Sequence, residues 1–128
     1  LGTGNLGNLT NVSKASLVAM MAGADFIKTS TGKEGVNATL PVTLVMLRAI
    51  RHFHDRTGFV VGFKAAGGIR KAKDALAYLM LVHEELGTAW LCNSRFRIGA
   101  SGLLGDLSRQ LEHRITARYS SDRRHPMG

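Results

Sequence analysis

The chain has 128 residues, of which 45% are hydrophobic and 20% are charged, and its formal net charge is +8. This composition is typical of one globular domain with a real core, and it excludes an intrinsically disordered chain. No apolar run approaches the roughly 20 residues that a membrane-spanning helix needs.

A helix and a short strand are the first predicted elements. Asn11 is expected to cap a helix over residues 12–22, which carries apolar side chains at helical spacing. Residues 25–29 then have the pattern of a buried strand, and a polar turn that contains Gly32 and Lys33 follows it.

A second helix and strand come next. Thr39 and Pro41 favour a helix start, and apolar residues continue at helical spacing to about Phe53. A second buried strand is predicted over residues 59–63, with Lys64 at its C-terminal end.

Two further helices and a strand complete the chain. Gly67 and Gly68 predict a tight turn before a helix over residues 72–86, and a strand over residues 96–100 leads into the last helix. The side chains at helical spacing in these two helices are Leu76, Leu79, Met80 and His83, then Leu103, Leu104, Leu107, Leu111 and Ile115. His83 and Cys92 are interpreted as structural residues, because no other candidate has metal-site spacing.

Helices and strands therefore alternate along the whole chain, with strands about 35 residues apart. This order predicts an α/β fold in which repeated βα units form a parallel sheet. The single cysteine, Cys92, excludes an internal disulfide and is compatible with a reducing cytosol, so we expect a cytoplasmic protein.

Glycine-bearing polar turns follow all three predicted strands. Because the C-terminal ends of parallel strands form one rim, these turns are expected to lie together. Backbone N–H groups in such turns can approach a phosphate closely, and nearby cations add charge. The candidate phosphate-binding residues are Gly32, Lys33, Gly67, Gly68, Arg70, Gly99 and Ser101.

Two lysines end the first two strands. Lys28 lies in an apolar run, and Lys64 would lie near it if the strands are neighbours about 4.8 Å apart. Like charges disfavour the ammonium form, and a neutral lysine is a nucleophile that can form a Schiff base. In the alternative, the two side chains point to opposite faces and never meet.

Many of the positive charges lie near the C-terminus, at Arg109, Arg114, Arg118, Arg123 and Arg124. They lack aromatic interleaving apart from Tyr119, and no nucleic-acid-binding motif accompanies them. A solvated helix face followed by a basic tail is therefore the favoured interpretation, and nucleic-acid binding is not expected.

Four segments carry a family resemblance: FIKTSTGK (26–33), NAT (37–39), GFKAAGGIR (62–70) and FRIGAS (96–101). Together they resemble the deoxyribose-phosphate aldolases, which are class I aldolases built on a TIM (β/α)8 barrel. The resemblance implies that residues 1–128 form a single partial domain, the C-terminal half of such a barrel. This half would run from the turn after strand 5 through helix 8, with a basic tail from about residue 117.

The resemblance also implies roles for individual residues. Lys28 matches the lysine that forms the Schiff base, and Lys64 matches the second lysine, which helps the first to lose its proton. The seven residues of the glycine-bearing turns match positions that hold the 5-phosphate. The implied reaction is the reversible cleavage of 2-deoxy-D-ribose 5-phosphate to glyceraldehyde 3-phosphate and acetaldehyde, in deoxyribonucleotide catabolism, with no metal or other cofactor.

The sequence departs from the family pattern at two points that bear on activity. Ala65 stands where the family usually has proline. The family's proton-shuttling aspartate lies on an earlier strand that this chain lacks, and Asp25 is a poor substitute for it. An alternative is therefore a half-barrel that binds a phosphorylated ligand or a partner chain without turnover. We expect self-association, or binding of a separate N-terminal half, and no membrane partner.

Overall fold

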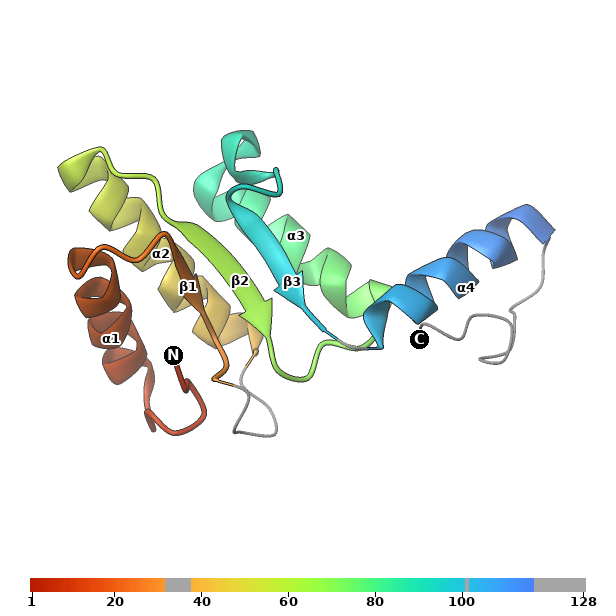
Figure 1. The fold of residues 1–128 in the computed structure, drawn as a ribbon, viewed down its shortest axis with the longest axis horizontal. Coiled ribbons are helices and arrows are strands. Elements are labelled where there is room, and N and C mark those ends of the chain that lie inside the picture. The colour runs from red at the N-terminus through yellow and green to blue at the C-terminus, as the bar shows by residue number, and fades with distance from the viewer. Residues whose placement is uncertain (32–37, 101, 117–128) are drawn as a thin grey trace.

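The computed structural model describes residues 1–31, 38–100 and 102–116. The elements in chain order are α1 (Leu9–Met21), β1 (Phe26–Lys28), α2 (Leu40–Thr57), β2 (Gly62–Ala66), α3 (Ala72–Leu86), the 3-10 helix η1 (Thr88–Trp90), β3 (Phe96–Gly99) and α4 (Leu103–Thr116) (Figure 1). The basic tail from about residue 117 lies outside the described residues.

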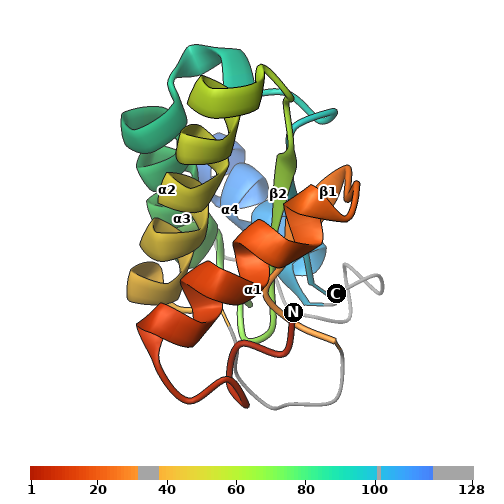
Figure 2. The same cartoon turned by 90° about the vertical axis from the view of Figure 1, so that its left-hand side faces the viewer.

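The three strands form one parallel sheet in the order β1-β2-β3. Helices α2 and α3 lie along one face of this sheet, and α1 packs beside α2 (Figure 2). A doubly wound fold would have helices on both faces, whereas a barrel has them on the outer face only. Parallel strands that alternate with helices on one side confirm the predicted fold class, in the arrangement of a segment of a TIM-barrel wall.

The core lies between the sheet and these helices. Met46, Leu47 and Ile50 of α2 are fully buried against the helix-facing side chains of the strands, Ile27 and Phe63. Burial of such side chains is the main stabilising contribution to folding. The opposite face of the sheet has no described helix packed on it (Figure 2).

Capping side chains account for the starts of α1 and α2, with one correction to the prediction. Thr39 caps α2 as predicted, and its hydroxyl accepts a hydrogen bond from Val42 N at 3.3 Å. The predicted cap of α1, Asn11, is wrong, because Asn8 is the N-cap and its side chain accepts from Asn11 N at 2.9 Å. The helix therefore begins three residues before its predicted start, since either asparagine satisfies the rule for an N-cap residue.

The predicted position of the second strand, residues 59–63, is also wrong. The strand is Gly62–Ala66, and Phe59 is 68% exposed while its ring stacks on Phe53 at the end of α2. Residues 59 and 60 are apolar but pair with no strand. The apolar run therefore did not by itself show which residues form the hydrogen-bonded strand. Lys64 consequently lies in the middle of β2 and not at its end.

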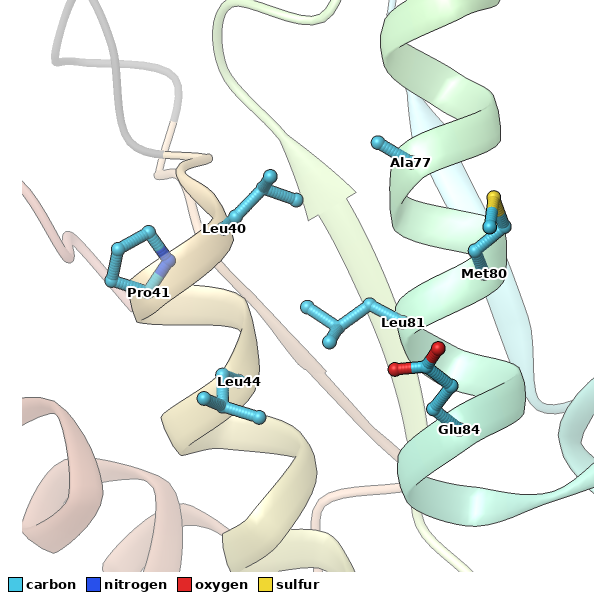
Figure 3. Close-up of a pocket in the computed structure, with 7 residues that line it drawn as sticks. All are labelled: Leu40, Pro41, Leu44, Ala77, Met80, Leu81 and Glu84. Carbon is cyan, nitrogen blue, oxygen red and sulfur yellow. The ribbon is translucent and has the colours of Figure 1, made fainter.

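Helix α3 has the predicted bounds but buries a different face. Tyr78 and Val82, one turn apart, are buried, whereas Leu76, Leu79 and Met80 are exposed. Met80 borders an apolar groove between α2 and α3, on the helix side of the sheet (Figure 3). This groove lies on the opposite side of the sheet from the face on which no described helix packs. We call that face the helix-free face.

Helix α4 has the expected apolar stripe, but most of the stripe is exposed. Leu103 is buried, whereas Leu111 and Ile115 are 64% and 84% exposed. The helix is attached near its start, where Asp106 Oδ2 accepts a hydrogen bond from Ala72 N at 2.8 Å, and it then extends away from the sheet (Figure 1). No helix in the described ranges has the length and hydropathy of a membrane span.

Candidate active site

Lys28 and Lys64 are register partners on the neighbouring strands β1 and β2. Directly opposite residues of a ladder project from the same face of the sheet. Ile27 and Phe63, the residues that precede the two lysines, are 2% and 0% exposed and pack into the core under the helices. Because side chains alternate along a strand, both lysines point to the helix-free face. The sheet therefore brings together the two lysines that the sequence singled out.

Arg97 of β3 is the register partner of Lys64 and extends the row of cations across the sheet. Its guanidinium carbon lies 4.5 Å from the ring centroid of Phe26, and its Nε donates to the carbonyl oxygen of Asn93 at 2.7 Å. Both contacts draw the guanidinium toward the N-terminal ends of the strands. The Arg97 guanidinium is thereby held on the N-terminal side of the two lysines and not beside their amines.

The side chain of Phe26 lies across β2 and reaches Arg97 on β3, and Gly62 leaves the space for its ring. A Cβ atom on Gly62 would lie 2.5 Å from Cε1 of the Phe26 ring, a distance that real side chains do not tolerate. The ring therefore rests on bare backbone and forms an apolar floor on the N-terminal side of Lys28. Phe26, Gly62 and Arg97 had no predicted role in the site. Strand alternation was the available signal, since residue 26 shares a face with residue 28.

Thr29 fixes the ends of β1 and β2 to each other. Its hydroxyl donates to the carbonyl oxygen of Ala66 and accepts from Ala66 N at 2.9 Å, and the side chain is fully buried. Thr29 N also donates to the carbonyl oxygen of Lys64 at 3.3 Å. These bonds lie immediately beyond the lysine pair, so they hold Lys28 opposite Lys64.

The first residues of the chain run along the other edge of β1. The nitrogen of Leu1 donates to the carbonyl oxygen of Lys28 at 2.6 Å, and Thr3 N donates to that of Thr29 at 3.1 Å. The Thr3 hydroxyl donates to the same carbonyl of Thr29 at 3.0 Å. These bonds attach the first residues of the chain to the backbone at the end of β1.

The predicted phosphate-binding residues are partly described. Gly67 and Gly68 form the turn after β2, and their φ angles of 99° and 97° are in the left-handed region that favours glycine. Arg70 is exposed just beyond them, and Gly99 ends β3 at the same rim. Gly32, Lys33 and Ser101 lie outside the described residues.

Other reactive side chains lie away from this face. His83 and Cys92, interpreted from sequence as structural residues and not metal ligands, are both exposed, so neither side chain packs in the core. A hydrogen bond from the Ser94 side chain holds the pKa of Cys92 below its ordinary value. Within the described ranges, no group of three or more His, Cys, Asp or Glu residues could hold a metal ion.

Comparison with known proteins gives one family and several close relatives. Residues 4–104 match the family described as DeoC/LacD family aldolase. The chain is 66% identical to deoxyribose-phosphate aldolase of Mus musculus and 65% identical to that of Homo sapiens, each over 99% of this chain. It is 57% identical to a putative deoxyribose-phosphate aldolase of Caenorhabditis elegans over 83% of this chain. The chain spans about 40% of the length of the mouse and human relatives.

Proposed function

We propose that this chain, which belongs to the DeoC/LacD aldolase family, supplies the Schiff-base lysine and the phosphate site of a deoxyribose-phosphate aldolase. The proposed reaction is the reversible cleavage of 2-deoxy-D-ribose 5-phosphate to glyceraldehyde 3-phosphate and acetaldehyde, in cytoplasmic deoxyribonucleotide catabolism. The observation that carries the proposal is the registered pair Lys28 and Lys64 on the helix-free face.

Lys28 is the proposed nucleophile. Its neutral amine attacks the aldehyde carbon, C1, of the open-chain sugar, and loss of water leaves an iminium ion. Removal of the proton from the C3 hydroxyl then breaks the C2–C3 bond, and the electron pair moves into an enamine on Lys28. Glyceraldehyde 3-phosphate leaves, the enamine takes up a proton at C2, and hydrolysis releases acetaldehyde and the free lysine.

Lys64 is proposed to favour the neutral form of Lys28. An ammonium group on the facing strand repels a second positive charge close to it. This role is supported by the register of the two lysines.

The phosphate is proposed to bind at the rim where β2 and β3 end. Gly67 and Gly68 can present backbone N–H groups without a Cβ atom in the way, and α3 begins directly afterwards at Ala72. Arg70 supplies a positive charge on the same turn. Gly32, Lys33, Gly99 and Ser101 complete the proposed set by resemblance.

The active enzyme is proposed to need more than this chain. The helix-free face carries the lysines, and the apolar stripe of α4 is largely exposed. Covering both would bury apolar surface and exclude water from the reaction. A further portion like the remainder of the mouse and human relatives, or a second copy of the chain, is the proposed partner, and the first would supply the proton-shuttling aspartate.

The uncovered face also favours a second candidate, a half-barrel that forms the imine or binds a phosphorylated ligand without turnover. Proton transfer contributes about 10²- to 10⁴-fold to such reactions, so this candidate predicts trapping of acetaldehyde without measurable cleavage. Both candidates predict a trapped adduct, and they differ only in whether cleavage of the sugar phosphate is measured as well.

Borohydride trapping tests the proposal. The protein is incubated with acetaldehyde, reduced, digested and analysed by mass spectrometry, with cleavage of the sugar phosphate assayed in parallel. We expect one reduced adduct, on Lys28, that is lost in Lys28→Arg and kept in Lys14→Arg, a matched change on the exposed side of α1. Adduct spread over many lysines, or unchanged in Lys28→Arg, would refute the assignment.

A further inference from the structure

Lys64 lies against the bare backbone of Gly99 on the neighbouring strand. A Cβ atom on Gly99 would lie 2.9 Å from Cε of Lys64 and 3.7 Å from its Nζ. Gly99 is not the register partner of Lys64, since that partner is Arg97, two residues earlier on β3. The Lys64 side chain therefore leans along the sheet toward the C-terminal end of β3.

Arg97 leaves room for this orientation. Its side chain turns the other way, with the guanidinium on the Phe26 ring and Nε bonded to the carbonyl oxygen of Asn93. Two cations that are register partners would otherwise compete for the same space and repel each other. Their separation along the strand direction places the Lys64 amine on the side where the glycine-bearing turns lie.

We propose that Gly99 is a positioning residue for Lys64, and that the space left by its absent Cβ holds the lysine stem. We call this space the seat. The inference rests on the proposed function, because it gives Gly99 a part in the chemistry of the lysine pair. This role differs from the phosphate contact that the family resemblance implies for Gly99. It acts at the amine and is independent of any phosphate group on the substrate.

An alanine at this position would displace the lysine while the fold persists. The added Cβ would also lie 3.0 Å from the Cβ of Ala66, so β2 and β3 would have to move apart by a few tenths of an ångström. The Lys64 contact is with the far end of a flexible side chain, which can move away at little cost. The Lys64 amine would then lose its orientation toward the rim.

The test measures the rate at which Lys28 is trapped by borohydride with acetaldehyde, which carries no phosphate. It uses the longest form of the protein that its source expresses. We expect Gly99→Ala to slow trapping by on the order of 10²-fold, the effect of a misplacement of about 1 Å. Gly102→Ala is the matched control, because a Cβ there meets nothing within 4 Å, and it should leave the rate unchanged.

A double-mutant cycle separates this role from a general structural one. In a Lys64→Ala background no stem occupies the seat, so Gly99→Ala should cause no further loss. An equal loss in both backgrounds, or no loss in the wild-type background, would overturn the proposal. If wild-type protein gives no Lys28 adduct at all, the proposed function fails first, and the two failures are thus distinguishable.

A second variant covers the case in which Gly99→Ala does not fold. Ala66→Gly removes the 3.0 Å contact with the new Cβ but leaves the contact with Lys64. The pair Ala66→Gly and Gly99→Ala should therefore fold, by circular dichroism, and still be trapped slowly relative to Ala66→Gly alone. If the double variant is trapped as fast as Ala66→Gly alone, the result would contradict the proposal that Gly99 seats the Lys64 stem.

Discussion

The side chain of Thr29 bonds both polar backbone atoms of one residue, Ala66, on the neighbouring strand. Its hydroxyl thus continues the β1–β2 ladder by one step after the regular strand β1 has ended at Lys28. The lysine pair lies immediately before this link. Slippage of β1 by one residue would turn its lysine away from Lys64 and would also break the Thr29 bonds.

Removal of the Thr29 hydroxyl should destabilise the fold and disturb the lysine register. Thr29→Val keeps the shape but leaves the buried N–H and C=O of Ala66 without this partner, at a cost of about 1–3 kcal/mol. Denaturant unfolding measures the loss, and Thr29→Ser, which keeps the hydroxyl, is the control. Equal stability of the Val and Ser variants would contradict the argument.

Loss of the charge at Lys64 should slow imine formation. Lys64→Met keeps a stem of similar length but removes the ammonium group from the strand that faces Lys28. We expect trapping with acetaldehyde at neutral pH to slow about tenfold. Equal trapping rates of the wild type and Lys64→Met would contradict a role for this charge.

Inorganic phosphate should stabilise the protein if the rim binds the substrate phosphate. At a hundredfold excess over its dissociation constant the gain is about 2.7 kcal/mol, seen as a rise in melting temperature. Arg70→Ala should weaken this effect, whereas Arg56→Ala, which makes the same charge change at the end of α2, should not. A rise no larger than that caused by chloride at equal ionic strength would argue against the site.

Tyr78 should make the fold less stable at alkaline pH. Its burial in α3, together with the nearby Asp74 carboxylate, raises the pKa of Tyr78 above its ordinary value. The folded state then holds the proton more tightly than the unfolded chain does. This contribution is full below about pH 10, the unfolded value, and is lost as the pH rises through the folded pKa.

The measurement compares wild type and Tyr78→Phe by denaturant unfolding between about pH 8 and pH 11. The stability of the wild type should fall relative to the variant at the alkaline end. Parallel curves would mean that the hydroxyl proton is held no more tightly in the folded protein.

A separately expressed N-terminal portion of the mouse or human relative should restore cleavage to this chain. Without the aspartate that this portion would supply, cleavage should be lower by about 10²- to 10⁴-fold. The assay follows glyceraldehyde 3-phosphate release, and the control mixture contains Lys28→Arg in place of the wild-type chain. Cleavage by this chain alone at the rate of the mixture would show that its own residues suffice.

Local patterns determined much of this fold. Helix α3 has the predicted bounds, Ala72–Leu86, because apolar spacing lies between the Gly67–Gly68 turn and Gly87. Thr39 and Pro41 correctly marked the start of α2. These signals depend on residues within one or two turns of each other, so they can be read without knowing what the segment packs against. The alternation of helices and strands followed from them.

The sequence also singled out Lys28 and Lys64, but only the sheet decided that they face each other. Apolar content placed the second strand three residues too early, because Phe59 and Val60 are as apolar as strand residues but make no ladder. Register depends on pairing between segments more than 30 residues apart, which no local pattern encodes. The seat of Lys64 on Gly99 has the same origin, since the missing Cβ matters only after β2 and β3 lie side by side.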